Sequence, residues 1–335
     1  TGLYPTQSGC FRNSIALPEG VKTLGDYLTE AGYETGYVGK WHLASTGELE
    51  KKPDIDYTIT AVPPELRGGY RGFWRAADVL EFTSHGYVFD EHMQKREFKG
   101  YRVDCITDFG LEFLDQVQKD KPFFLTISHI EPHHQNDRHC YEGPAGSKTR
   151  FQDFVLPADL QALPGNAAEM YPDYLGCCRS LDDNLGRVVD KLKAMGIWEN
   201  TILIFASDHG SHFMTRNRDA HLNGYDDYKR SCHDACLHVP LVICGPGFEG
   251  GKRISELVST ASLPKTILAM ASIDVGDQMI GENLQTVVDG KIQNRPNRIF
   301  AQISESRVGR CIRTANYLYS VYAPGVHGGE VMDSD

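Results

Sequence analysis

The order of apolar and polar residues predicts strands and helices that alternate along most of the chain. Short apolar runs without alternation are typical of strands that are covered on both faces. Longer segments with an apolar residue at every third or fourth position are typical of helices that pack on a sheet. The predicted strands lie at residues 36–39, 122–128, 201–205 and 239–244, and the predicted helices at 24–31, 103–118, 174–194 and 262–270. Such alternation predicts an α/β fold, a mainly parallel sheet sandwiched by helices.

An irregular stretch and a C-terminal group of short strands lie outside this alternation. Residues 44–100 carry many Pro, Gly and aromatic residues, and we expect a long irregular loop there that forms a rim for substrate recognition. Short apolar runs predict an antiparallel unit with strands at residues 299–304, 310–314 and 317–322. The sequence therefore predicts an α/β domain at residues 1–290 and the beginning of a small antiparallel subdomain at residues 291–335.

Three clusters of polar residues directly follow predicted strands: Lys40 with His42, His133, and Asp208 with His209. Because open α/β sheets carry their chemistry at the carboxyl ends of the strands, we expect the clusters to meet at one edge. Lys40 and His42 are two residues apart, so on an extended segment both project to one side, where they can bind an anion and move a proton. Asp208 and His209 offer an oxygen and a nitrogen ligand for a divalent metal ion. Together, the clusters predict a hydrolytic site for an anionic ester.

Each cluster taken alone also has an ordinary structural interpretation. Asp208 can cap a following helix, with His209 as a polar loop residue, and Lys40 can be a surface lysine. The histidine-rich segment 129–134 suggests a zinc site, but its spacing fits no closed structural-zinc pattern. The occurrence of three clusters at three strand ends favours the functional interpretation.

Composition narrows the classes of partner. The chain of 335 residues is 41% hydrophobic and 24% charged, which is typical of a soluble globular protein. It contains no apolar run of about 18 residues, so we expect no membrane span. The formal net charge of −11 argues against a nucleic-acid binder, although local lysines can still bind an anionic substrate. Nine scattered cysteines indicate free thiols and favour the cytoplasm, while no targeting segment is visible and nothing in the sequence indicates an oligomeric state.

Motifs along almost the whole chain resemble those of the sulfatase family in the alkaline-phosphatase-like superfamily. Residues 32–42, which end in Gly-Lys-Trp-His, are similar to the second sulfatase signature, and residues 1–5 resemble the end of the first one. The segments 131–133 (Glu-Pro-His) and 207–210 (Ser-Asp-His-Gly) also resemble family motifs, as does the placement of Lys229. The resemblance implies an alkaline-phosphatase-like fold and a sulfuric ester hydrolase that acts on a small-molecule or glycan sulfate ester.

The resemblance also implies catalytic roles for four residues. Lys40 and Lys229 would bind the sulfate oxygens or the nucleophile. His133 would contact the sulfate and help to protonate the leaving oxygen. His42 would be the base that later breaks down the sulfated enzyme.

The implied cofactors are a divalent ion and formylglycine. Asp208 and His209 would supply two ligands of a calcium ion, for which Mg²⁺ or Mn²⁺ are alternatives, and His209 stands where many relatives have Asn. The nucleophile, a formylglycine made from Cys or Ser, would lie before Thr1 together with the paired aspartates of the first strand. We therefore expect the chain to be a fragment that is inactive alone and lacks the first strand of its catalytic domain.

Two other functions fit the same residues. A phosphodiesterase or phosphonate monoester hydrolase of the same superfamily would use a similar site, because phosphonate and sulfate monoester anions share a tetrahedral shape and a charge. An inactive relative would only bind sulfated glycans. Comparing the turnover of an aryl sulfate with that of an aryl phosphonate separates the first alternative from a sulfatase.

Overall fold

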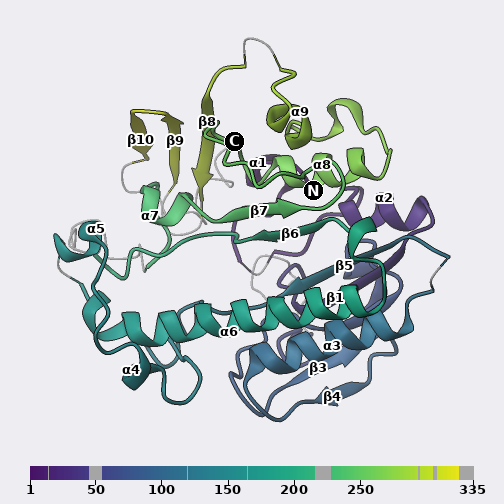
Figure 1. Cartoon of the computed structure of the whole chain (residues 1–335), viewed down its shortest axis with the longest axis horizontal. Helices are drawn as coiled ribbons and strands as arrows, with labels where there is room; N and C mark the ends of the chain where they lie inside the picture. The colour runs from purple at the N-terminus through teal and green to yellow at the C-terminus, as the bar shows by residue number, and fades with distance from the viewer. Residues whose placement is uncertain are drawn as a thin grey trace. The chain divides into compact units, whose positions relative to one another are not determined.

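The computed structural model describes residues 1–13, 15–44, 55–118, 120–163, 165–215, 228–292, 295–304 and 308–323 of the chain. The chain divides into two compact units. The first unit is Asn13–Ile197, and the second unit combines Thr1–Arg12 with Trp198–Asp335. In Figure 1 the first unit is coloured from purple to teal, and the second unit is green to yellow except for its N-terminal residues, which are purple.

The first unit is built on a five-stranded sheet with the order β4-β3-β2-β1-β5. Its centre is parallel, because β1 (Glu34–Lys40) pairs in parallel with both β2 (Phe73–Ala77) and β5 (Phe123–Ser128). The strands β3 (Tyr87–Asp90) and β4 (Lys95–Glu97) extend it as an antiparallel edge. The carboxyl ends of β2, β1 and β5 therefore lie side by side at one edge of the sheet.

Helices cover both faces of this sheet. The helix α3 (Arg102–Gln116) packs on β1 and β5, and a side chain added at Gly36 would point into it. Thr35, the preceding strand residue, lies 3.2 Å from Thr29 of α2 (Leu24–Glu30), measured between their hydroxyl oxygens. Because successive residues of a strand point to opposite faces, α2 and α3 cover opposite sides of the sheet.

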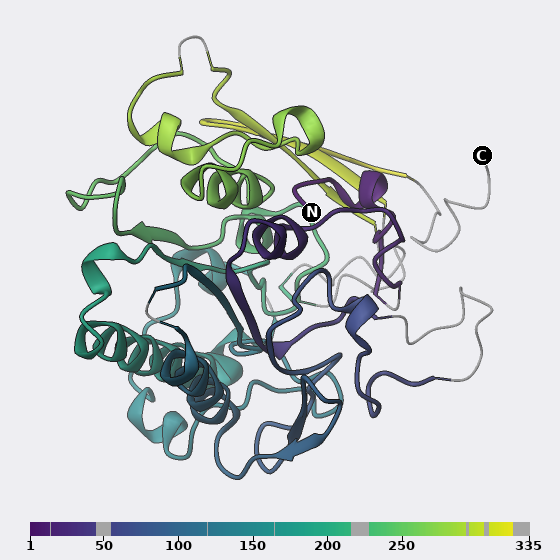
Figure 2. The ribbon, with the colours of Figure 1, turned by 90° about the vertical axis from the view of Figure 1, so that its right-hand side faces the viewer.

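A further helix lies outside α3. The long helix α6 (Ala167–Ala194) packs along α3, and the two run side by side in Figures 1 and 2. The buried Asn184 of α6 donates a hydrogen bond of 2.7 Å to Asp104 of α3. The first unit also contains the short helices η1 (Pro64–Leu66), α4 (Ser147–Arg150) and α5 (Ala158–Gln161).

Aromatic side chains form a core cluster beside β1 and β2. Trp74 of β2 is fully buried, and Tyr37 of β1 stacks on it with 5.3 Å between the ring centroids. Tyr70 and Trp41 contact Tyr37 edge to face, each with 5.0 Å between centroids. Such aromatic pairs contribute about 0.5–1.5 kcal/mol each beyond the burial of their area. The cluster therefore anchors Trp41, directly after the end of β1.

The second unit contains a two-stranded sheet and a helical pair. The strand β6 (Leu203–Ala206) pairs with β7 (Leu241–Cys244) in antiparallel orientation. The helix α8 (Ser262–Met270) contacts α9 (Leu284–Val288), and the hydroxyl of Thr266 accepts a hydrogen bond of 2.9 Å from the first backbone N–H of α9. The unit also contains the short helices α1 (Pro5–Ser8), η2 (Trp198–Asn200), α7 (Asp234–Leu237) and η4 (Gly276–Gln278).

A three-stranded antiparallel sheet ends the described part of the second unit. Its order is β10-β9-β8, with β8 at Arg298–Ile303, β9 at Gly309–Thr314 and β10 at Leu318–Tyr322. These strands lie within two residues of the predicted ones, and the predicted C-terminal antiparallel unit is confirmed. The domain boundary at residue 290 stays a prediction, and residues 324–335 of that predicted subdomain lie outside the described residues.

The predicted α/β class is confirmed, with a parallel sheet centre between helices in the first unit. Two local expectations are wrong. Residues 44–100 are not an irregular loop, because β2, β3 and β4 all lie within them. The strand after residue 200 is not covered on both faces as expected, because the β6 side chains are half-buried or exposed and its described partner β7 is antiparallel. Among the described residues, no helix combines the length and apolarity that a membrane crossing requires.

Candidate active site

A glycine at the end of β1 brings the first candidate residues close to β5. Gly39 has φ 104° and pairs with Ser128. A Cβ atom at Gly39 would lie 2.0 Å from the carbonyl oxygen of Ser128, so any other residue would push the two strands apart. Lys40 follows directly as the last residue of β1.

The chain turns sharply after Lys40. The backbone N–H of Trp41 donates a hydrogen bond of 2.9 Å to Ala77 at the end of β2, and His42 adopts a left-handed conformation with φ 80°. A left-handed non-glycine residue is uncommon and needs support from its surroundings. The expectation of an extended segment from Lys40 to His42 is therefore wrong at His42, because the strand ends at Lys40 and His42 is left-handed.

A buried aspartate supports this turn. Asp78 directly follows β2 and is 0% exposed. Its Oδ1 atom accepts hydrogen bonds of 3.0 Å from the backbone N–H groups of His42 and Ala44. Burial raises the pKa of the Asp78 carboxyl to about 6, although these backbone donors and the charge of Lys40 act in the opposite direction. Sequence reasoning missed Asp78, and its only signal was an acidic residue directly after a buried strand.

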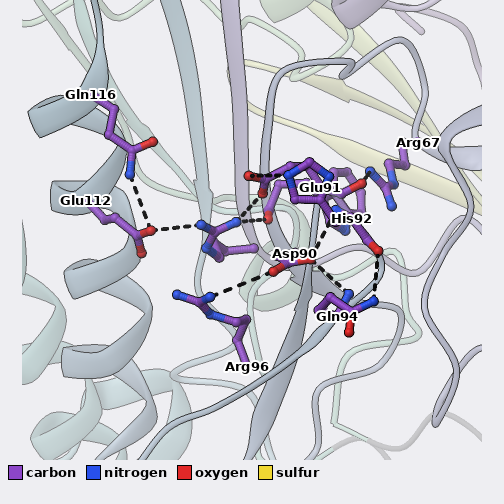
Figure 3. A network of polar contacts seen from close by, with 10 residues as sticks. Arg67, Asp90, Glu91, His92, Gln94, Arg96, Glu112 and Gln116 are labelled. Atoms are coloured by element: carbon purple, nitrogen blue, oxygen red, sulfur yellow. Dashed lines mark hydrogen bonds and ion pairs between the residues drawn. The ribbon is translucent and has the colours of Figure 1, made fainter.

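Charged side chains fix β2 against its neighbours. Arg75, in the middle of β2, is only 5% exposed and forms ion pairs with Glu91, just after β3, and with Glu112 of α3, the latter at 2.8 Å. Figure 3 shows Glu112 on its helix and Glu91 on the opposite side of the network. A buried arginine needs such carboxylate partners to offset its desolvation. The network therefore holds β2 in place, and with it the strand end that leads to Asp78.

His133 follows β5 in a turn that fixes its ring. The backbone N–H of His133 donates to the carbonyl oxygen of Ile130 at 3.0 Å, and its ring Nδ1 lies 2.6 Å from the carbonyl oxygen of His134. A carbonyl oxygen only accepts, so Nδ1 carries the proton and donates it to this bond. The other ring nitrogen, Nε2, therefore carries the lone pair of the neutral ring.

A buried ion pair anchors the segment that carries His133. Glu131 and Arg102 of α3 are at most 1% exposed at their side chains, with 2.9 Å between Nη2 and Oε1. The same guanidinium donates to the carbonyl oxygen of Leu80 at 2.8 Å. Burial, and then the charge of Arg102, lowers the pKa of the neighbouring His129 to about 4. His129 is therefore neutral at neutral pH and does not act as a proton donor at that pH.

The strand register brings the predicted residues of the first unit to one sheet edge. Lys40 pairs with Ala77, and Gly39 pairs with Ser128. Asp78, the Lys40–His42 turn and the segment leading to His133 thus follow three neighbouring parallel strands. This is the edge at which parallel sheets carry ligands and catalytic groups.

In the second unit, Asp208, His209 and Lys229 lie together. The backbone N–H of His209 donates to Asp208 at 2.9 Å, and its ring Nδ1 donates to the carbonyl oxygen of Gly210 at 2.9 Å. The ring Nε2 therefore carries the lone pair, and the ammonium of Lys229 donates to it at 3.2 Å. The three side chains line one cavity of this unit. The structure thus brings together the three site residues that the sequence predicts here.

The family of the chain follows from comparison with known proteins. The Sulfatase family model matches residues 1–273. The chain belongs to the sulfatase family. The match spans the Gly-Lys-Trp-His and Ser-Asp-His-Gly motifs and all six predicted site residues.

Known sulfatases resemble the chain in sequence and in fold. An uncharacterized sulfatase of Escherichia coli, YidJ, is 29% identical over 320 residues, which cover 86% of this chain and 59% of that protein. A putative sulfatase yidJ from Bacteroides fragilis has a similar structure, with a TM-score of 0.80, 21% identity, and coverage of 96% of this chain and 74% of that one. Another similar structure holds its substrate D-glucosamine-2-N,6-O-disulfate, with a TM-score of 0.68, 18% identity, and coverage of 98% and 78%. The chain spans about three fifths of the length of the first curated relatives it matches.

The metal site implied by the sulfatase family is matched in part. The carboxylate of Asp208 is 88% exposed, and its Oδ1 lies 3.8 Å from Nε2 of His209. Two such donors fit one edge of a divalent-ion site, whereas calcium takes six to eight ligands. Within the residues that the structure describes, no group of three or more His, Cys, Asp or Glu converges on one point. Asp208 and His209 thus match part of the implied donor set, and the described residues do not complete it.

Proposed function

We propose that the protein is a sulfatase that hydrolyses a sulfate ester of a sugar. One observation supports this most directly: in a chain of the sulfatase family, neighbouring parallel strands lead to a lysine with a histidine and to a second histidine at one sheet edge. A cation and two imidazoles are the groups that transfer of an anionic sulfuryl group requires. The substrate class is suggested by a structural neighbour whose substrate is a sulfated glucosamine.

The proposed roles follow from the charge and protonation of each side chain. The ammonium groups of Lys40 and Lys229 bind the sulfate oxygens and offset negative charge that shifts during transfer. His133 donates a proton from Nε2 to the leaving oxygen, because its Nδ1–H is held by the carbonyl oxygen of His134. His42 acts as the base in the later breakdown of the sulfated enzyme.

We further propose that the protein uses a divalent ion and a formylglycine. Asp208 and His209 would hold the ion, which supplies positive charge beside the sulfate, and calcium is the first candidate, before Mg²⁺ or Mn²⁺. A formylglycine hydrate would supply the attacking hydroxyl. Peptide mass spectrometry of the full-length protein tests for formylglycine directly.

The activity is tested with two sulfate esters that differ in their leaving group. The full-length protein should hydrolyse both 4-methylumbelliferyl sulfate and glucosamine 6-sulfate. A His133→Ala variant should lose about 100-fold or more in kcat/KM on the sugar sulfate, because a sugar alkoxide leaves poorly without a proton. The loss on the aryl sulfate should be smaller, since a phenolate leaves without full protonation.

The control for this test is His92→Ala, which removes a histidine that is 79% exposed outside the proposed site. It should change neither rate more than about twofold. Equal losses on both esters in His133→Ala would contradict the role of His133 as the acid. Faster turnover of 4-nitrophenyl phenylphosphonate than of either sulfate would overturn the sulfatase proposal in favour of a phosphonate monoester hydrolase.

The metal proposal is tested by calcium binding, measured calorimetrically on the full-length protein. Asp208→Asn should weaken calcium binding at least about tenfold, because it removes an anionic oxygen ligand. Lys229→Met should strengthen calcium binding, because the Lys229 ammonium donates a hydrogen bond to His209 Nε2 and so competes with the ion for its lone pair. Asp153→Asn, at an exposed residue, is the control and should change nothing. Unchanged affinity in Asp208→Asn would refute the proposed ligand.

A further inference from the structure

Asp78 is a buried carboxylate to which the proposed mechanism gives no role. It lies at the end of β2, one residue after Ala77, which pairs with Lys40. Its Oδ1 accepts the backbone N–H groups of His42 and Ala44, both at 3.0 Å. The carboxylate therefore binds the backbone of the segment that follows Lys40, at His42 and at Ala44.

The turn needs an acceptor at this position. His42 has φ 80°, which a residue with a Cβ atom adopts only at a cost. The N–H groups of His42 and Ala44 both point inward to the same oxygen, so without Asp78 two donors would lose their partner. Successive backbone N–H groups that converge in this way form a concave site for an anion. Asp78 therefore selects the conformation in which Lys40 and His42 are presented.

The same unit contains a second aspartate with this geometry on an ordinary turn. Asp90 is 5% exposed, and its Oδ1 accepts the backbone N–H groups of His92 and Gln94 at 3.0 and 2.8 Å. Figure 3 shows Asp90 with these two residues and with Arg96, whose guanidinium lies 3.8 Å from its other oxygen. The turn after Asp90 carries none of the predicted site residues. Asp90 thus provides a matched reference for what such a bond pattern contributes to folding alone.

Asp78 differs from Asp90 in its charge environment. Its second oxygen, Oδ2, is buried and has no hydrogen-bond partner among the described residues. Lys40 is the cation whose charge acts on this carboxyl. An asparagine would accept the same two backbone bonds without a buried charge, which is costly to desolvate. A carboxylate at this position therefore contributes something that an amide cannot, namely negative charge beside Lys40.

We propose that Asp78 is a positioning residue for the sulfatase reaction, which fixes the turn from Lys40 to Ala44 and sets the charge around Lys40. The proposal rests on the proposed function of Lys40 and His42. Asp78 itself need not touch the substrate, and it acts through the backbone of His42 and the ammonium of Lys40.

The experiment compares Asp78 and Asp90 variants of the full-length protein on 4-methylumbelliferyl sulfate. Asp78→Ala should lower kcat about 100-fold and change KM less than about threefold, because the turn loses its acceptor while Lys229 and His133 are unaffected. Asp78→Asn should recover part of this loss, to about tenfold below wild type, because the backbone bonds remain and the charge is gone. Asp90→Ala should keep kcat within about threefold of wild type.

Hydrogen exchange gives a readout that does not depend on turnover. The amides of His42 and Ala44 should be protected in wild type and in Asp78→Asn, and should exchange rapidly in Asp78→Ala. The Asp90→Ala variant should leave both amides protected. If wild type hydrolyses no sulfate ester, the proposed function fails, while these exchange rates still report whether Asp78 holds the turn.

Two results would overturn the role of Asp78. One is kcat within threefold of wild type in both Asp78 variants. The other is an equal loss of kcat in Asp90→Ala and Asp78→Ala, which would mean that only general stability is affected. If Asp78→Ala does not fold, the test rests on Asp78→Asn. A wild-type kcat in Asp78→Asn would show that the negative charge of Asp78 does not contribute to the reaction.

Discussion

At the scale of single residues, backbone carbonyl groups fix which ring nitrogen carries the proton in two of the candidate histidines, His133 and His209. In His133 and in His209, Nδ1–H donates to a neighbouring carbonyl oxygen, which leaves Nε2 for a proton or a metal ion. His129 lies close in sequence to His133, but burial keeps it neutral at neutral pH. Adjacent histidines thus differ in chemistry because their surroundings differ.

The raised pKa of Asp78 predicts how stability changes with pH. The folded protein holds the Asp78 proton up to about pH 6, whereas the unfolded chain releases it near the ordinary value of 3.8. Between these values the folded state binds more protons, so the free energy of unfolding falls as pH rises. The Asp78→Asn variant lacks this titrating carboxyl, so its free energy of unfolding relative to wild type should increase by about 2 kcal/mol between pH 4 and pH 7.

Urea denaturation at pH 4, 5, 6 and 7 measures this difference, and Asp90→Asn serves as the control. The fluorescence of Trp41 and Trp74 reports on the first unit, in which both aspartates lie. A stability difference between Asp78→Asn and wild type that stays constant over this range would show that the carboxyl titrates normally in the fold.

At the scale of elements, the candidate residues of the first unit depend on how strands and helices are tied together. The centre β2-β1-β5 sets the spacing of the strand ends, and α3 is linked to this edge by Arg102. The guanidinium bonds Glu131, two residues before His133, and also the carbonyl oxygen of Leu80. One helix residue therefore holds the segments that follow two different strands.

Breaking this buried ion pair should be costly. Arg102→Met leaves the carboxylate of Glu131 buried without its cation, which should lower the free energy of unfolding by about 3–5 kcal/mol. The double variant Arg102→Met/Glu131→Gln should recover part of this loss, because no unpaired charge remains. Chemical denaturation followed by tryptophan fluorescence measures both changes.

An exposed ion pair between α3 and α6 is the control for this prediction. Arg187 of α6 and Asp108 of α3 are 41% and 60% exposed at their side chains. Arg187→Ala should cost less than about 1 kcal/mol, because solvent screens an exposed pair. A similarly small cost for Arg102→Met would mean that Glu131 takes up a proton or finds another partner.

At the scale of the whole molecule, local signals in the sequence were enough to predict most of the helices and strands. The helix α2 lies within one residue of its predicted range and begins at a capping box, in which Thr23 and Asp26 bond each other's backbone N–H groups. The strands of residues 44–100 were missed because Arg75 interrupts the apolar run of β2 and all three residues of β4 are exposed. These strands are recognisable only from their pairing.

Interactions between distant residues could not be predicted in this way. Asp78 accepts a hydrogen bond from His42, which lies 36 positions earlier in the chain, and no sequence pattern within β2 predicts that bond. The antiparallel pairing of β6 with β7 likewise joins segments more than 30 residues apart. Motifs in the sequence predicted the candidate site residues, whereas the carboxylate that accepts the backbone N–H of His42 became visible only in the fold.

The contact between Gly39 and the carbonyl oxygen of Ser128 has a consequence for how this protein can change. The distance between the segment after Lys40 and the segment that carries His133 is set by the strand register and by the missing side chain of Gly39. Substitutions of other side chains therefore cannot change this distance in small steps. New substrate preferences should therefore arise in the segments beyond the strand ends, as loops generally vary more than the scaffold that carries them. A mutant library for altered sugar specificity should randomise those segments and keep both strands invariant.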